Sequence, residues 1–170
     1  VRITLSMNRI QSVPSSTFGS LKKRGNETQL TTADGAGDSW KHSLFVPLHY
    51  EKKYAYPLLV WFHGSGDDQR QLKRVMPGIS LRNYIAVAPQ GTSACFGECT
   101  SDDSIEAHCW EQTEADIVEA QFRLTSCIEK VQSRYNIHPE RVFVGGYADG
   151  GTMALRLALR MPHLCAGAIS

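Results

Sequence analysis

The 170-residue sequence has no apolar run long enough to span a membrane, and no signal-peptide layout opens it. Both absences lead us to expect a cytoplasmic protein without a membrane span. The charges nearly cancel, with a formal net charge of +1 at pH 7, so there is no electrostatic case for binding nucleic acid or an anionic membrane. No internal repeat is visible, which excludes a solenoid.

The chain has five cysteines, an odd number, which argues against a complete disulfide framework. Cys95, Cys99, His108 and Cys109 fall in one expected loop, where they offer four nitrogen and sulfur ligands of the kind that hold zinc. Their spacing, C-x3-C-x8-H-C, fits no common zinc pattern. Unpaired thiols, or a single Cys95–Cys109 bridge in an exported protein, are simpler interpretations. We therefore expect neither a metal nor another cofactor.

The composition is that of a soluble globular domain, with 42% hydrophobic and 21% charged residues. A chain of this length is able to bury a sizeable core. Residues 1–38 are polar, rich in Ser, Thr, Gly and Asn, and show little periodicity, which predicts a flexible N-terminal tail. Residues 39–170 are expected to form the ordered domain.

Expected strands and helices alternate along the chain from Trp40 onward. The apolar and β-branched segments that predict strands are residues 40–47, 56–62, 84–89, 142–144 and 166–169. The segments with helical periodicity or capping signals are residues 69–76, 113–135 and 152–161, the first closed by Pro77 and the last by Pro162. This alternation predicts an α/β fold with a doubly wound, mostly parallel sheet.

The most informative stretch is the glycine-bounded turn between residues 142–144 and the helix that follows. Glycines on both sides of the turn free the backbone and let the helix start hard against the strand. Strand, sharp turn and tight helix together predict a nucleophile elbow of the G-x-S-x-G type. The frame Gly146-Tyr147-Ala148-Asp149-Gly150, however, places alanine where the serine belongs.

These motifs resemble those of the α/β-hydrolases, most closely the phospholipase/carboxylesterase and depolymerase-like esterases. Such enzymes carry Gly-Phe/Tyr-Ser-x-Gly-Gly before a helix of small residues, and the likeness extends over roughly residues 40–170. The resemblance implies a three-layer αβα fold whose sheet is truncated here after about the sixth strand. It also implies that the family chemistry is ester hydrolysis through an acyl-enzyme, with the acid and histidine of the triad beyond Ser170.

A second motif, His63-Gly64-Ser65-Gly66-Asp67, follows the expected strand at residues 56–62. Read alone, it is equally an ordinary turn. By resemblance it is the oxyanion loop, and the backbone N–H groups of Ser65 and Asp149 are the donors that would stabilise an acyl oxyanion. The same resemblance implies a set of binding residues and one packing or substrate-wall position near the mouth of the site. The binding residues are His63, Gly64, Gly66 and Tyr147, and the wall position is Trp110.

No residue of the sequence replaces the missing serine in an obvious way. Asp149 stands one position after the apex, so we expect its side chain to point away from the apex and to act at the helix N-terminus. Tyr147 has no neighbouring base to activate it. None of the six histidines is placed to act as the general base of a triad.

Three hypotheses remain open for the function. The one we favour is a degenerate hydrolase, a pseudoenzyme that binds a small ester-like ligand or a protein partner. The second is a true serine esterase seen in a Ser-to-Ala form that lacks its C-terminal part. The third is a structural domain whose Cys/His loop binds metal. Separately, the last expected strand leaves an open sheet edge, through which we expect the chain to self-associate.

Overall fold

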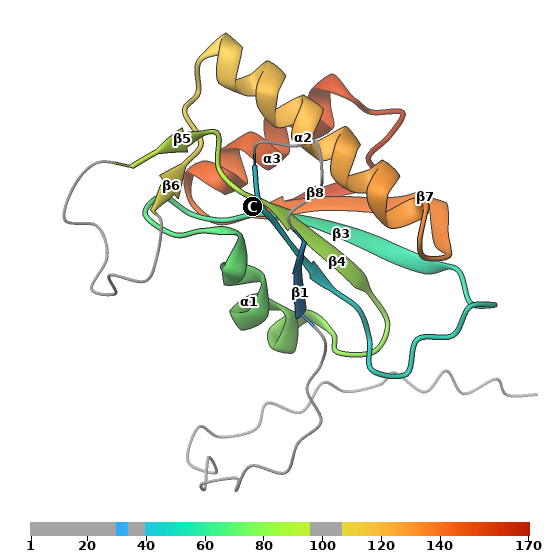
Figure 1. The fold of residues 1–170 in the computed structure, drawn as a ribbon. Helices are drawn as coiled ribbons and strands as arrows, with labels where there is room; N and C mark the ends of the chain where they lie inside the picture. The colour runs from blue at the N-terminus through green and yellow to red at the C-terminus, as the bar shows by residue number, and fades with distance from the viewer. Residues whose placement is uncertain (1–29, 34–39, 96–106) are drawn as a thin grey trace, which may run out of the picture.

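The computed structural model describes residues 30–33, 40–95 and 107–170 of the chain (Figure 1). The strands are β1 (Leu30–Ala33), β2 (His42–Phe45), β3 (Tyr56–Phe62), β4 (Ile85–Pro89), β5 (Ser93–Ala94), β6 (His108–Cys109), β7 (Ile137–Gly146) and β8 (Gly167–Ile169). The helices are η1 (Gln69–Gln71), α1 (Leu72–Ile79), α2 (Glu114–Gln132) and α3 (Asp149–Arg160). Of the described helices, none is long and apolar enough to cross a bilayer.

Six of these strands form one sheet in the order β1-β2-β4-β3-β7-β8. Strands β4, β3, β7 and β8 are parallel to one another. At one edge, β2 runs antiparallel to β4, and β1 runs antiparallel to β2. In the middle of the sheet, Val60 of β3 lies opposite Val87 of β4 and Val144 of β7. The prediction of a mostly parallel α/β sheet is confirmed.

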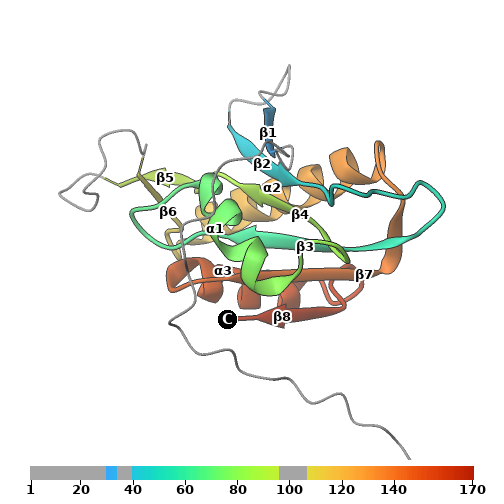
Figure 2. The same ribbon diagram turned by 90° about the horizontal axis from the view of Figure 1, so that it is seen from below.

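Helices cover both faces of the sheet, with α2 and α3 on one side and α1 on the other (Figures 1 and 2). The alternation of side chains along a strand decides which residue meets which layer. Leu58, Val60 and Phe62 of β3 belong to the core under α2 and α3. Leu59 faces the opposite way and packs with Met76 of α1. A strand buried on both faces explains why residues 56–62 form a continuous apolar run.

Helix α2 is built as its sequence predicts. The side chain of Thr113 accepts a hydrogen bond from the Asp116 N–H and caps the first turn. One stripe of the helix is buried on the sheet: Ile117, Ala120, Leu124, Ile128 and Val131. The helix ends at Gln132, three residues before the predicted end, while the Tyr135 N–H still bonds to the Val131 carbonyl in the closing turn.

Helix α1 differs from the prediction, which ended it at Pro77. A short turn, η1, leads into α1, and the helix continues through Pro77 to Ile79. Proline removes one donor from the helix, but Leu72 and Met76 are fully buried against the sheet. The packing of these two side chains outweighs the missing hydrogen bond, so the predicted helix end is wrong.

The edges of the sheet bear on two further expectations. Strand β1 pairs with β2 from within the segment predicted to be a tail, so Leu30–Ala33 belong to the sheet. The remainder of that predicted tail lies outside the described residues. At the other edge, β8 pairs only with β7 among the described strands, and Ile169 is 59% exposed. Self-association through this edge stays a prediction.

The start of α3 lies against the end of β3 at a distance that only glycine permits. A Cβ atom on Gly150 would lie 2.2 Å from the His63 carbonyl oxygen and 2.4 Å from that of Phe62. A Cβ atom on Gly146 would lie 2.5 Å from the Gly150 backbone. These glycines therefore fix the distance between the turn after β7 and the loop after β3.

We expect Gly150→Ala to lower the free energy of unfolding by about 3 kcal/mol or more, or to prevent folding, because the backbone it meets cannot move aside. Gly78→Ala in α1 is the matched control, since its added Cβ would meet nothing within 4 Å. That change should be neutral or stabilising by up to about 1 kcal/mol. Urea unfolding of both variants measures the difference, and equal stabilities would contradict the packing described.

Candidate functional site

The turn between β7 and α3 has a strained residue at its apex. Ala148 has φ 53° and ψ −122°, and it is the one non-glycine residue with positive φ in the described part of the chain. Such a conformation costs on the order of 1–3 kcal/mol and persists only where its surroundings impose it. Here the Tyr147 N–H bonds to the Phe62 carbonyl at 3.2 Å, and the Thr152 N–H bonds to the Ala148 carbonyl at 3.1 Å.

His63 opens the loop after β3, and its ring is fully buried. The ring Nε2 accepts a hydrogen bond from the Gly91 N–H at 2.9 Å, so the proton is assigned to Nδ1, which donates to the Gly64 carbonyl at 2.9 Å. Burial lowers the pKa of this imidazole below its ordinary value of 6.5. His63 therefore ties two loops together as a neutral group.

Asp149, the first residue of α3, is hydrogen-bonded to two loops by its carboxylate. Its Oδ1 accepts from the Ser65 N–H at 2.7 Å. Its Oδ2 accepts from the Ser65 hydroxyl at 2.8 Å and from the Trp110 N–H at 3.0 Å. The backbone donor predicted to face an oxyanion thus has the Asp149 carboxylate as its acceptor. The sequence predicted the position at the helix N-terminus but neither of these partners.

Trp110 lies in the interior, with 2% of its surface exposed. Its indole N–H donates to the His63 carbonyl at 3.0 Å, and its ring packs edge-on against Phe62 at 4.9 Å between centroids. Trp110 thus packs in the core beneath the turn, and its role at the mouth of the site stays a prediction. Because its side chain is anchored in the core, Trp110 is held with its own backbone N–H against the Asp149 carboxylate.

The remaining predicted binding residues lie around the turn. The Tyr147 side chain is 67% exposed, and a Cβ on Gly64 would lie 2.9 Å from its ring. Gly66 has φ 77°, a left-handed conformation that favours glycine. The structure thus brings Gly64, Ser65, Tyr147, Ala148 and Asp149 together around the turn.

A two-stranded hairpin, β5–β6, stands beside this turn where the sequence predicted a loop. Strand β6 also pairs with the oxyanion-loop motif on its other side, since the Gly66 N–H bonds to the His108 carbonyl at 3.1 Å and the His108 N–H to the Asp67 carbonyl at 3.0 Å. Strands of two residues leave no readable periodicity, so sequence analysis missed them.

The metal hypothesis concerned residues of this hairpin. In the described ranges, no group of three or more His, Cys, Asp or Glu side chains is arranged to hold a metal ion. The Nε2 atom of His108 lies 2.6 Å from the side-chain nitrogen of Gln90. Cys99 lies outside the described residues.

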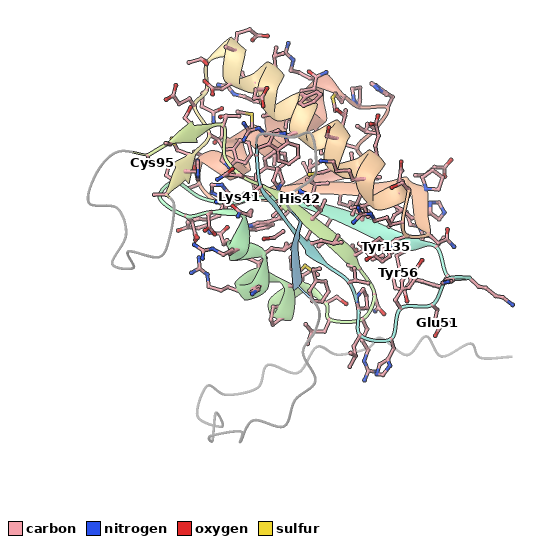
Figure 3. All side chains as sticks on the ribbon, viewed as in Figure 1. Lys41, His42, Glu51, Tyr56, Cys95 and Tyr135 are labelled. Carbon is pink, nitrogen blue, oxygen red and sulfur yellow. The ribbon has the colours of Figure 1, made fainter. Side chains whose placement is uncertain are left out.

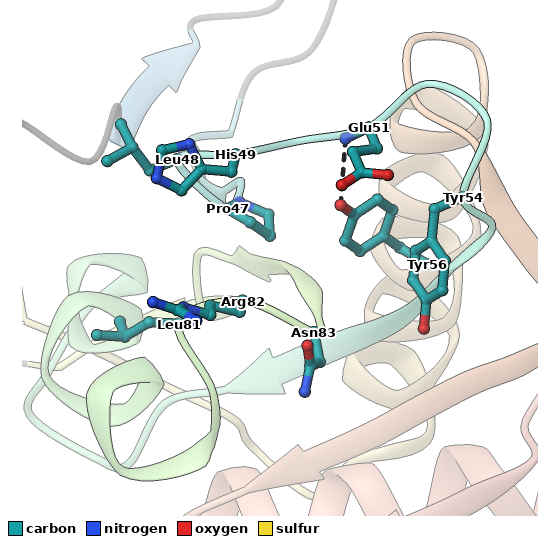
Figure 4. Close-up of a pocket in the computed structure, with 9 residues that line it drawn as sticks. All are labelled: Pro47, Leu48, His49, Glu51, Tyr54, Tyr56, Leu81, Arg82 and Asn83. Carbon is teal, nitrogen blue, oxygen red and sulfur yellow. Dashed lines mark hydrogen bonds between the residues drawn. The ribbon is translucent and has the colours of Figure 1, made fainter.

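A separate cavity of about 550 Å³ opens at the amino ends of β3 and β4 (Figure 4). Its lining residues are Pro47, Leu48, His49, Glu51, Tyr54, Tyr56, Leu81, Arg82 and Asn83. Ligands of open parallel sheets bind at the carboxyl ends of the strands, where the Ala148 turn lies. This cavity is therefore not part of the candidate site.

The sheet is mostly parallel and lies between two helical layers, and a strained strand–turn–helix lies beside the loop of a second strand. This combination defines an α/β-hydrolase fold. The sequence profile of one family within this class, described as Phospholipase/Carboxylesterase, matches residues 48–170. The chain belongs to that family. No match was found among curated proteins.

Several solved structures of similar fold are esterases. A carboxylesterase from Mesorhizobium loti is 16% identical with a TM-score of 0.59, over 84% of this chain and 64% of its own. A thermostable esterase is 20% identical with a TM-score of 0.55, over 82% of this chain and 39% of its own. A ferulic acid esterase from Anaeromyces mucronatus is 14% identical with a TM-score of 0.55, over 86% of this chain and 60% of its own. The chain thus spans less than two thirds of each.

The neutral His63 predicts an acid-sensitive fold. Because its folded pKa lies below 6.5, the unfolded chain takes up a proton as the pH falls below about 6.5 while the folded chain does not. The free energy of unfolding should fall by up to about 1.4 kcal/mol per pH unit, until the pH reaches the folded pKa. Urea unfolding at pH 7.5 and 5.5 measures this. His63→Gln should make the free energy of unfolding depend less on pH, and the exposed control His163→Gln should leave the dependence as it is. An unchanged slope in His63→Gln, or a flattened slope in His163→Gln, would contradict the role given to His63.

Asp149→Ala should lower the free energy of unfolding by about 1–3 kcal/mol, because it leaves the donors of Ser65 and Trp110 without their acceptor. The free energy of unfolding of Asp149→Asn should lie between that of the unsubstituted chain and that of Asp149→Ala, since the amide keeps one accepting oxygen. Glu114→Gln is the control: it also alters an acid in the first turn of a helix, but its partner is the exposed Arg160, and no change is expected. Equal effects at positions 149 and 114 would argue against the role given to Asp149.

Proposed function

We propose that this chain is a catalytically silent member of the phospholipase/carboxylesterase family that uses the hydrolase pocket to bind a ligand. The observation that carries the proposal is the backbone of Ala148, which adopts a strained positive-φ conformation at the apex of the turn while its side chain offers no reactive atom. A turn with the strained backbone of a nucleophile elbow supports a surface at this end of the sheet that still receives a ligand.

The neighbouring side chains support the absence of turnover. His63 is buried and its Nε2 accepts the Gly91 N–H, so it is not available to deprotonate a nucleophile. The Asp149 carboxylate is engaged by Ser65 and Trp110. Removing the nucleophile of a serine triad leaves only about 10³- to 10⁴-fold acceleration over water, from the oxyanion hole and binding. That remainder is too small for useful turnover of most esters.

The charge at the turn restricts the class of ligand. The Asp149 carboxylate lies on the Ser65 N–H, so an anion approaching this donor meets a negative charge. A neutral ester carbonyl is able to share the donor or to turn to the Asp149 N–H, which is the second predicted oxyanion donor. We therefore infer a neutral, ester-like small molecule as the ligand, with a protein partner at the same surface as the alternative.

A true serine esterase is the second candidate. Its support is the family itself and the esterases of similar fold, of which this chain spans 39% to 64%. On this reading serine stands at position 148 of the working enzyme, and an acid and a histidine come from further sequence. A longer coding sequence with serine at 148 and both partners would favour the esterase. The third hypothesis, a metal-binding Cys/His loop, has no support from the described part of that loop.

Hydrolysis of p-nitrophenyl butyrate by the 170-residue chain should not exceed the buffer rate. Ala148→Ser should leave it there, because a serine without a base remains a poor nucleophile. Turnover that survives repurification and is blocked by a serine-directed inhibitor would overturn the proposal for the chain as it stands.

Binding is tested with the same ester, which should persist intact in the sample. Amide resonances of Ser65, Tyr147 and Asp149 should shift in ¹⁵N–¹H spectra on titration, and Tyr147→Ala, which removes the exposed ring beside the turn, should weaken the shifts. Resonances of Glu51 and Arg82 at the separate cavity serve as the internal control. Shifts at the cavity alone, or none at the turn, would remove support for a ligand-binding pocket.

A further inference from the structure

Two cysteine thiols meet on one face of the β5–β6 hairpin. Cys109 of β6 lies opposite Ser93, and the Cys95 N–H bonds to the Ala107 carbonyl at 2.9 Å, two positions further along. Residues two positions apart on paired antiparallel strands are diagonal neighbours, and their side chains lie on the same face of the pair. The Cys95 thiol lies close enough to the Cys109 thiol to raise the pKa of Cys109, and both residues are partly exposed.

The other described cysteines occupy different surroundings. Cys127 is fully buried in α2, where burial raises the pKa of its thiol. Cys165 is half-buried between α3 and β8, and burial raises its pKa as well. Cys95 lies at the end of the hairpin, far from Tyr56 and Glu51 at the opposite end of the sheet (Figure 3). Within the described part of the chain, Cys95 and Cys109 are thus the thiols best placed to react with each other.

We propose that Cys95 and Cys109 are a redox-responsive pair that closes to a reversible disulfide on reaction with a low-molecular-weight disulfide such as oxidised glutathione. The inference rests on the hairpin geometry and the surroundings of the two thiols, and it is independent of the proposed function. It concerns a modification site of this chain, set beside the candidate pocket.

The reaction proceeds by two thiol–disulfide exchanges. The Cys95 thiolate attacks one sulfur of glutathione disulfide, forms a mixed disulfide and releases one glutathione thiolate. The Cys109 thiolate then attacks the Cys95 sulfur and releases the second glutathione. Two protein thiols are oxidised, one glutathione disulfide is reduced to two glutathione molecules, and the two protein protons pass to these products.

The order of attack follows from the surroundings of Cys109. Burial, followed by contact with the Cys95 thiol, raises the pKa of Cys109 to about 12, so its thiolate is scarce at neutral pH. Cys109 also lies 3.7 Å from the Ser93 carbonyl oxygen, to which its S–H donates. Cys109 is accordingly the resolving thiol, and Cys95 takes the first step.

The pair is connected to the candidate site through the backbone of β6. His108, beside Cys109, pairs with Asp67 of the loop that carries Ser65. Trp110, on the other side of Cys109, donates its N–H to Asp149. A disulfide that anchors β6 to β5 therefore also restrains both segments that bind the Asp149 carboxylate.

The test uses the full 170-residue chain carrying Cys99→Ser, so that the pair is examined without the cysteine between them. The folded protein is equilibrated in buffers of varied ratio of reduced to oxidised glutathione, trapped with N-ethylmaleimide, and analysed by intact mass and peptide mapping. We expect the loss of two hydrogens in oxidising buffer, a Cys95–Cys109 cross-linked peptide, and full reversal on adding reduced glutathione.

Two further variants identify the partners. In the same background, Cys109→Ser should stop at a glutathione adduct on Cys95, and Cys95→Ser should react slowly or not at all. Cooperative thermal unfolding of each variant shows that it is folded. A folded chain that stays fully reduced in oxidised glutathione would overturn the proposal, as would a bridge that uses Cys165 or, in the unsubstituted chain, Cys99 in place of either thiol.

Discussion

The close approach of α3 to the end of β3 is the constraint on which the candidate site depends. Gly150 lacks a side chain where any Cβ would overlap the carbonyls of Phe62 and His63. The helix can therefore begin directly beside the strand, and the backbone between β7 and α3 must turn within the two residues Tyr147 and Ala148. The positive φ of Ala148 is the geometric result of that short connection, and the packing on both sides stabilises it.

The same approach brings two segments that are distant in sequence to one carboxylate. Asp149 reaches the loop after β3 through Ser65 and the segment after β6 through Trp110. The neutral ring of His63 joins the first of these loops to the segment after β4 by accepting the Gly91 N–H. Polar contacts thus hold the loops at the carboxyl ends of the strands, while the apolar layers beneath hold the strands themselves.

Much of the fold was readable from the sequence because its central strands are apolar on both faces, as in residues 56–62 and 85–89. The turn was readable because glycine spacing reports a close approach directly. The acceptor role of Asp149 was not readable, since its partners lie 84 and 39 residues away along the chain. Strands β5 and β6 are too short to show a period, and α1 passes through Pro77 because Leu72 and Met76 are buried beneath it. In each miss, tertiary contact overrode or replaced the local signal.

The backbone of Ala148 also limits which residues the position accepts. A β-branched or bulky side chain is strongly disfavoured at positive φ, so substitution there is confined mainly to small residues. Serine is among them, and the alanine and serine codon families differ by a single base. The backbone of this turn therefore admits serine as readily as the alanine that occupies it.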